Sequence, residues 1–157
     1  MIRMIQSTSS KQAKRYFSEE LGRSDYYVND QELPGVFKGK LAARLGIEGL
    51  ASKEAFFHLA ENKHPLTGNP LTPRTKDNRI VGYDVNFHAP KSLSILQGLG
   101  HDPRLLEAFQ VSVDATMKEI EKAALVRVRK GKVYEDRKSG EIIYADFVHQ
   151  PARPVGD

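Results

Sequence analysis

The sequence predicts an α+β fold in which a mainly antiparallel sheet, with Asp84 and His149 on central strands, is flanked by helices. Residues 80–87 alternate between apolar and polar side chains, as a strand with one buried face does. Residues 102–124 begin with a capping aspartate and a proline and then repeat apolar residues every three or four positions, which predicts a long amphipathic helix. Residues 125–135 and 141–149 look like further strands, with turns near residues 130–131 and 139–140. The strand at 141–149 is apolar on both faces, so it should lie in mid-sheet.

The N-terminal part of the chain should hold a short strand and three shorter helices. Ser9 and Gln12 have the spacing of a capping box, and Ser52 stands where a helix should start. The elements expected are a strand at 2–6, helices at 9–21, at 41–45 and from 52, a break at 22–25, an extended piece at 26–28, and a polar loop at 62–79. A helix beginning near Pro90 should follow the strand at 80–87.

Length and composition are those of a single globular domain. The chain has 157 residues, of which 39% are hydrophobic and 28% charged, and its formal net charge is +4. That charge is a mild bias towards anionic partners. The absence of cysteine excludes disulfides, thiolate metal sites and cysteine nucleophiles. No apolar run reaches membrane-spanning length and the N-terminus lacks a signal-peptide core, so a cytoplasmic protein is expected.

Several residues could support chemistry on phosphate groups. Asp84 lies on the polar side of the strand at 80–87, and Lys91 follows at the positive end of a helix, a suitable place for a phosphate. Three phenols near the N-terminus, at Tyr16, Tyr26 and Tyr27, could act as oxygen nucleophiles. The alternative interpretations are an ordinary edge strand with a solvated face and aromatic residues that serve the core. The helical spacing favours an inward direction for Ala13, Tyr16, Phe17 and Leu21.

Further candidates lie in the loop and at the chain end. Arg74, Lys76 and Arg79 form a small basic cluster within the loop at 62–79, although cations on a loop are often only solvated. His149 stands at the end of the last expected strand, where a histidine more often serves structure than metal binding. No two histidines have the spacing of a self-contained zinc site, and serine-hydrolase and P-loop motifs are missing. The residues alone favour phosphoryl chemistry on an anionic polymer.

Four blocks of the sequence, in order, resemble the MobF relaxases, the TrwC/TraI type of conjugative DNA nickase. Residues 12–17 with 25–27 resemble that family's paired-tyrosine start, and 37–46 resemble its W-x-G-K-G-A-x-x-L-G segment. Residues 82–94 are similar to its G-Y-D-L-T-F-S-A-P-K-S-V-S block, and 147–153 to the strand with its first metal histidine. The resemblance implies the palm-like fold that relaxases share with rolling-circle initiators.

The resemblance also implies roles for individual residues. Tyr16 matches the nucleophile that attacks the scissile phosphate of single-stranded DNA, leaving a 5′-phosphotyrosine link and a free 3′-hydroxyl. Asp84 matches the acid that orients a metal histidine or accepts the proton, and Tyr26 or Tyr27 matches the second tyrosine pair. His149 matches a ligand of a divalent ion, expected to be Mg²⁺ or Mn²⁺. The residues expected to contact DNA phosphates are Arg74, Lys76, Arg79, Lys91 and Arg153.

The sequence departs from the family pattern in ways that bear on activity. Phe17 replaces a tyrosine, so the first pair offers one nucleophile. Phe37 and Leu41 replace a tryptophan and a glycine, and His88 replaces a serine. The family's His-x-His pair follows a segment that matches the last residues here, so 1–157 is expected to be the N-terminal part of one relaxase domain and inactive alone.

The expected partners are single-stranded DNA at a plasmid transfer origin and, beyond it, relaxosome proteins. One alternative is a non-enzymatic DNA-binding module or remnant that keeps the fold without a metal site. A rolling-circle initiator or related transposase is less favoured, because those proteins usually place the tyrosine after the His-x-His motif. Here Tyr16 precedes His149.

Overall fold

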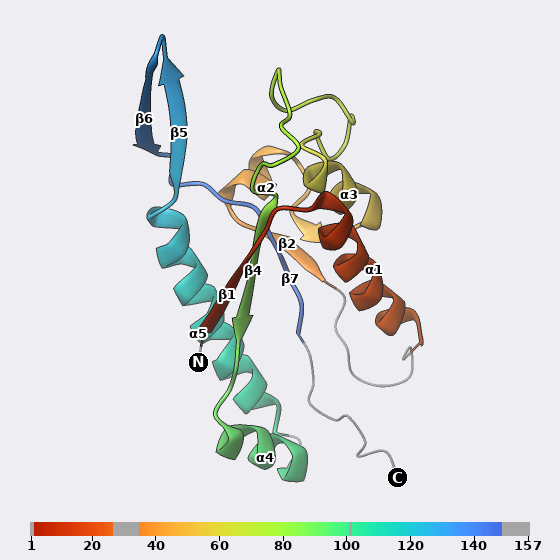
Figure 1. Cartoon of the computed structure of the whole chain (residues 1–157). Helices are drawn as coiled ribbons and strands as arrows, with labels where there is room; N and C mark the ends of the chain where they lie inside the picture. Colours follow the sequence, from red (N-terminus) through yellow and green to blue (C-terminus); the bar gives the residue numbers. More distant parts are fainter. Residues whose placement is uncertain (1, 27–34, 101, 149–157) are drawn as a thin grey trace.

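The computed structural model of the chain describes residues 2–26, 35–100 and 102–148. It is an α+β fold, as the sequence predicts (Figure 1). Its elements in chain order are β1 (Ile2–Ser7), α1 (Ser10–Tyr26), β2 (Val36–Lys38), α2 (Lys40–Arg44), β3 (Gly49–Leu50), α3 (Lys53–Ala60), β4 (Gly82–Phe87), α4 (Lys91–Gly100), α5 (Pro103–Lys122), β5 (Leu125–Lys130), β6 (Val133–Lys138) and β7 (Tyr144–Asp146).

The strands form three small antiparallel sheets. β1 pairs with β4, β2 lies between β3 and β7, and β5 pairs with β6. The alternation that predicts a strand at 80–87 is therefore confirmed, with β1 as its partner. Asp84 was expected on a central strand, but within the described residues β4 pairs with β1 alone. β7 was expected to be long and in mid-sheet, yet it spans three residues and has one partner strand among those described.

The core lies where α2 and α3 pack against β2. Phe37 on β2 is buried together with Ala42 on α2, Ile47 after it and Ala55 on α3. Ser52 begins α3, as predicted, because its hydroxyl accepts a hydrogen bond from the Ala55 amide at 3.1 Å. The resulting platform supports α1, which packs on α3.

Helix α1 is longer than the sequence predicts. Its start is as expected, since the Ser9 hydroxyl accepts the Gln12 amide at 3.3 Å. The predicted break at residues 22–25 is wrong, because the helix continues to Tyr26. A glycine inside a helix costs only about 1 kcal/mol relative to alanine, so Gly22 alone does not end it.

Helix α5 is tied to the β2–α2 junction by a buried carboxylate. Asp102 caps the helix start as predicted, accepting the Arg104 amide at 3.0 Å. Near the other end, Glu121 is only 7% exposed. One of its oxygens, Oε2, accepts the backbone amides of Lys40 at 2.8 Å and Ile142 at 3.1 Å. This single side chain therefore joins three segments that are distant in sequence.

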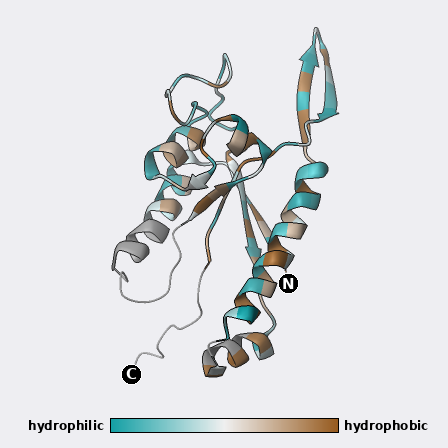
Figure 2. Cartoon of the chain, turned by 180° about the vertical axis from the view of Figure 1, so that it is seen from behind, coloured by the Kyte–Doolittle hydropathy of each residue, from teal (hydrophilic) through white to brown (hydrophobic). Residues whose placement is uncertain are grey.

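Strands β5 and β6 form a two-stranded ribbon that projects away from the other elements at the end of α5 (Figure 1). The turn at Gly131 has a positive φ of 62°, and the sequence predicts a turn there. The base of the ribbon is closed by a hydrogen bond from the Ser139 amide to the Ala124 carbonyl at 2.9 Å. The ribbon carries both hydrophilic and hydrophobic residues (Figure 2).

Candidate functional site

Two neighbouring aromatic residues on α1 have opposite environments. Tyr16 is 42% exposed, whereas Phe17 is fully buried at 0%. Consecutive residues of a helix point about 100° apart, so Phe17 faces α3 while Tyr16 lies towards solvent. The sequence pattern placed both residues on the inward face of the helix, which is right for Phe17 and wrong for Tyr16. An exposed phenol can reach a polymeric substrate, and a buried ring cannot.

The Phe17 ring joins α1 to two other parts of the fold. It stacks on Phe56 of α3, with ring centroids 4.1 Å apart and planes at 12°. Its edge also meets Phe147, with a centroid distance of 5.5 Å and an angle of 73°. Phe147 follows β7 and is two residues before His149. The contact therefore brings the helix of Tyr16 against the segment that leads to His149.

Asp84 is half-buried on β4, opposite Ile5 of β1. Within the part of the chain that the structure describes, its carboxylate forms no hydrogen bond or ion pair. Among those residues, it therefore makes no hydrogen bond with Tyr16. His88, which replaces a serine of the family pattern, is exposed just after β4.

Several of the predicted site residues fall outside what the structure describes. Tyr27, His149 and Arg153 lie outside the described residues, and Tyr26 is described only as the last residue of α1. Their assignments stay predictions from the sequence.

The cationic residues predicted to contact DNA differ in their exposure and in their hydrogen bonds within the protein. Arg74 and Lys76 are exposed on the loop, and Lys91 is exposed as the first residue of α4. Arg79 is half-buried and its guanidinium donates a hydrogen bond to the carbonyl of Ala60, the last residue of α3. Arg79 thus has a partner within the protein, while Arg74, Lys76 and Lys91 are exposed.

The loop at 62–79 is held in a defined shape. Asn62 adopts a positive φ of 61° and its side-chain amide donates to the hydroxyls of Thr72, at 2.6 Å, and Thr75, at 3.1 Å. The Nδ1 atom of His64 accepts the amides of Leu66 and Thr67 at 3.2 and 3.3 Å. These bonds present the basic cluster on a fixed support, which favours the functional interpretation of a long loop.

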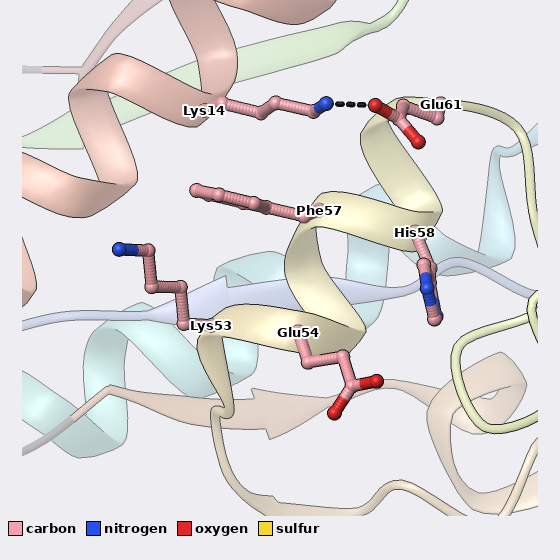
Figure 3. Close-up of a pocket in the computed structure, with 6 residues that line it drawn as sticks. All are labelled: Lys14, Lys53, Glu54, Phe57, His58 and Glu61. Atoms are coloured by element: carbon pink, nitrogen blue, oxygen red, sulfur yellow. Dashed lines mark hydrogen bonds and ion pairs between the residues drawn. The ribbon is translucent and has the colours of Figure 1, made fainter.

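An open pocket of about 460 Å³ lies beside the contact between α1 and α3 (Figure 3). The ammonium groups of Lys14 and Lys53 each lie 5.4 Å from the centre of the Phe57 ring. Lys14 also forms an ion pair with Glu61. Two lysines and two glutamates, Glu54 and Glu61, line the pocket, so it has no excess charge to attract an anion and we assign it no DNA contact.

Lys38 links β2 to α5 and β7 through a polar network. Its ammonium group lies 3.0 Å from Asp114 Oδ1 and 2.8 Å from Asp146 Oδ2, and Gln110 donates to the same two oxygens. Partial burial by itself lowers the pKa of Lys38, but the hydrogen bonds to Asp146 and Asp114 outweigh it and raise the pKa above its ordinary 10.5. For Tyr144, burial has the opposite effect and raises the pKa of the phenol, which makes it a poor nucleophile.

The Lys38 network predicts a stability difference that depends on pH. A pKa raised by folding stabilises the folded state fully below the ordinary value of 10.5, and the contribution is lost as the pH rises through the folded-state pKa. We expect Lys38→Met to lower the unfolding free energy at neutral pH, since it leaves two carboxylates without their cation. Urea unfolding of both proteins should show this difference shrinking above the ordinary pKa. A constant difference at alkaline pH would contradict the assignment.

The β5–β6 ribbon is a further candidate nucleic-acid contact, which the motifs in the sequence do not point to. Residues 125–138 contain six basic residues (Lys or Arg) and two acidic residues (Asp or Glu). Their excess of four positive charges equals the net charge of the whole chain. Arg127 and Arg137 pair with the two carboxylates, while Lys130 and Lys132 flank the turn and are exposed. The concentration of basic residues in this short stretch of the sequence could have identified it.

This arrangement of helices and small antiparallel sheets is that of conjugative relaxases solved with DNA. A structure described as conjugative relaxase TrwC in complex with oriT DNA, metal-free, matches with a TM-score of 0.74 and 22% identity, covering 98% of this chain and 51% of that one. A complex of TrwC with a 27-mer DNA comprising the recognition hairpin and the cleavage site also matches with a TM-score of 0.74, at 20% identity, over 98% and 50% of the two chains. A metal-bound TrwC–oriT DNA structure matches with a TM-score of 0.71 and 22% identity, over 92% and 49%.

Sequence comparison establishes the family. The TrwC relaxase family model matches residues 10–157. The multifunctional conjugation protein TraI of Escherichia coli K12 is 30% identical over 154 residues, which are 98% of this chain and 8% of TraI. The chain belongs to the TrwC relaxase family, as its motifs predict. It spans about half of the solved TrwC chains and a small part of the curated relatives.

The described residues do not form a metal-binding site. Among residues 2–26, 35–100 and 102–148, no group of three or more His, Asp or Glu side chains is placed to hold a metal ion. The described residues therefore do not by themselves fit the divalent ion that the family resemblance implies.

The same ranges contain no helix that is long and apolar enough to cross a bilayer.

Proposed function

We propose that this chain is the N-terminal part of a relaxase domain that nicks single-stranded DNA at a plasmid transfer origin, with Tyr16 as the nucleophile. The observation that carries the proposal is the exposed phenol of Tyr16 beside a buried Phe17 whose ring contacts Phe147. Family membership and the solved complexes of TrwC with oriT DNA support the substrate. The proposal includes a cytoplasmic location, with relaxosome proteins as partners.

The proposed reaction is a transesterification. The Tyr16 oxygen forms a bond to the phosphorus of the scissile phosphate as the bond from phosphorus to the 3′-oxygen breaks. The phenolic proton leaves to a base, and the departing strand takes up a proton as a 3′-hydroxyl. The product is a 5′-phosphotyrosine, so the phosphodiester linkage is conserved for religation. The ordinary pKa of a phenol is about 10, so the attack requires a base or an adjacent cation.

Asp84 is our candidate for that base or for an orienting carboxylate. Its half-buried position on β4 and the absence of a bonded partner within the described residues support this role. Tyr26 and Tyr27 are candidates for a second transfer. His149 is proposed as one ligand of a divalent ion, Mg²⁺ or Mn²⁺, and a metal-bound TrwC structure supports metal dependence. Such an ion would offset charge on the phosphate. Because the described residues do not form its site, we assign no step of the reaction to it.

DNA binding is proposed to use basic residues at several separate places on the molecule. Arg74, Lys76 and Lys91 lie on the loop and at the start of α4, and Arg153 and Arg79 are further candidates for phosphate contacts. The β5–β6 ribbon has the width that a major groove admits, and its basic turn suits phosphates. A TrwC complex with a recognition hairpin supports a duplex stem as the ribbon's ligand.

The nucleophile is tested by replacing it. We expect Tyr16→Phe to abolish the covalent adduct with single-stranded DNA while leaving the fold and the non-covalent affinity unchanged, because only the oxygen is removed. The adduct resists denaturation in SDS, so gel electrophoresis measures it. Tyr83→Phe is the matched control, since Tyr83 is also an exposed phenol. An adduct that forms in Tyr16→Phe as readily as in Tyr83→Phe would refute the assignment.

The ribbon is tested through the salt dependence of binding. The double variant Lys130→Ala/Lys132→Ala should bind a hairpin oligonucleotide more weakly. A plot of log affinity against log salt concentration should also become less steep, by about 0.9 for each phosphate that the variant no longer neutralises. Fluorescence anisotropy over a salt series measures this. Lys11→Ala with Lys118→Ala removes two other exposed lysines and should keep the wild-type slope. Equal slopes in both double variants would exclude the ribbon as a DNA contact.

A second candidate is a remnant module that binds DNA without cutting it. The observation in its favour is that the described residues hold no group able to bind a metal ion. In that case DNA binding would persist with no adduct from the complete reading frame under any divalent ion.

A further inference from the structure

We infer that Asn62, at the end of α3, is a positioning residue that holds the basic loop at a fixed place relative to α1, the helix of Tyr16. The inference rests on the proposed function, in which Arg74 and Lys76 contact DNA phosphates and Tyr16 is the nucleophile. A strand that is bound by a fixed loop meets the nucleophile in a defined register, because its distance from α1 does not vary.

The loop segment that carries the two cations has no support from the core. Residues 71–78 are all exposed, and Arg74 and Lys76 lie in the middle of them. An exposed polar segment without other support samples many conformations, and a ligand that bound it would have to order it. The shape of this segment therefore depends on hydrogen bonds from its neighbours.

Asn62 supplies hydrogen bonds on both sides of Arg74. Its carbonyl oxygen accepts the amide of Leu71 at 3.0 Å. Its side-chain amide donates to the hydroxyls of Thr72, at 2.6 Å, and Thr75, at 3.1 Å. The Thr72 hydroxyl donates in turn to the carbonyl of Arg74 at 2.9 Å. One residue thus holds the backbone before and after the first cation.

The far end of the segment returns to the same place. The guanidinium of Arg79 donates a hydrogen bond to the carbonyl of Ala60, two residues before Asn62. The amide of Arg79 donates to the carbonyl of Lys76 at 3.3 Å. The segment is therefore attached at both of its ends to the end of α3.

The end of α3 is also attached to α1. Lys14 of α1 forms an ion pair with Glu61, the residue directly before Asn62 (Figure 3). Further along the two helices, Phe17 stacks on Phe56 with ring centroids 4.1 Å apart. The loop and the helix of the nucleophile are therefore joined through one short piece of backbone at the end of α3.

The positioning is tested first without DNA. The chain has no cysteine, so Lys11→Cys with Lys76→Cys introduces a unique pair of exposed sites for spin labels, one on α1 and one on the loop. Asn62→Gly tolerates the positive φ of 61° and keeps the backbone carbonyl, so it removes only the side-chain bonds. It should broaden the distance distribution between the labels, measured by double electron–electron resonance, by about twofold or more.

Asn69→Gly is the matched control. It is the same substitution in the same loop, at a side chain that makes no hydrogen bond within the described residues, and it should keep the wild-type width. Thr72→Val with Thr75→Val removes the hydroxyls that Asn62 bonds and should broaden the distribution as Asn62→Gly does. Equal widths for Asn62→Gly and Asn69→Gly, or a wild-type width for the threonine variant, would overturn the inference.

The link to DNA is tested with the complete reading frame and single-stranded oligothymidylate, by fluorescence anisotropy. Asn62→Gly should weaken binding by about fivefold or more, because the phosphate contacts lose their fixed support. In the variant Arg74→Ala/Lys76→Ala the same change should have no further effect, since the groups that it positions are absent. An equal loss in both backgrounds would overturn the positioning role. The proposed function fails separately, if the wild type forms no covalent adduct.

Discussion

Replacing Gly39 by alanine should destabilise the fold by about 3 kcal/mol or more, which combines backbone strain with a steric clash. Gly39 has a φ of +101°, a region that residues with a Cβ atom rarely adopt. A Cβ atom there would lie 2.2 Å from the carbonyl oxygen of Ile142, which accepts the Leu41 amide at 3.2 Å. The alanine would therefore also separate the segments that this hydrogen bond joins. Urea unfolding followed by circular dichroism measures the loss.

Gly49 provides the matched control for Gly39. Its φ is +119°, but no atom lies within 4 Å of the place where a Cβ would be. Gly49→Ala should therefore show the strain without the clash, a loss of about 1–2 kcal/mol. If the two variants lose the same unfolding free energy, the steric clash between residue 39 and the Ile142 carbonyl does not contribute to the loss. The position matters for function because Gly39 lies in the block that resembles the relaxase W-x-G-K-G segment.

Removing the Glu121 carboxylate should be comparably damaging. Glu121→Ala leaves the amides of Lys40 and Ile142 without their acceptor in a buried place, at roughly 1–3 kcal/mol for each unsatisfied group. Glu121→Gln keeps a carbonyl oxygen that can accept the same amides, so its loss should be smaller. Unfolding free energies from urea titration measure both variants.

Glu119 is the control for this effect. Its side chain is 72% exposed and pairs with Lys122 on the surface of the same helix. Glu119→Ala should change stability by no more than about 0.5 kcal/mol, since exposed ion pairs contribute little. A loss in Glu121→Ala as small as that in Glu119→Ala would show that the buried carboxylate does not hold the β2–α2 junction to α5.

The elements that local sequence specifies were predicted well. Asp102 and Ser52 are helix caps whose side chains bond the amides two and three residues later, and such signals need no knowledge of the fold. The turn at Gly131 follows from its residue type and the alternation around it. Family motifs then predicted the α+β class, because they are tied to one arrangement of these elements.

Features that depend on packing between distant segments could not be predicted in the same way. Tyr16 and Phe17 fit the same helical pattern, and only α3 and Phe147 decide which of them is buried. Glu121 was overlooked because a glutamate is normally exposed, although it lies four residues after Met117 on the buried stripe of α5. Its burial follows from the two amides it accepts, which belong to other elements.

Mapping the DNA-linked tyrosine tests the central claim most directly. The protein made from its complete reading frame is incubated with Mg²⁺ and a pool of random single-stranded oligonucleotides labelled at the 3′ end, which a 5′-phosphotyrosine link retains. Trypsin cleavage after Arg15 and Arg23 releases residues 16–23, in which Tyr16 is the sole tyrosine. We predict that mass spectrometry finds the nucleotide on this peptide. Label on the peptide that contains Tyr26 and Tyr27, with none on residues 16–23, would contradict the account.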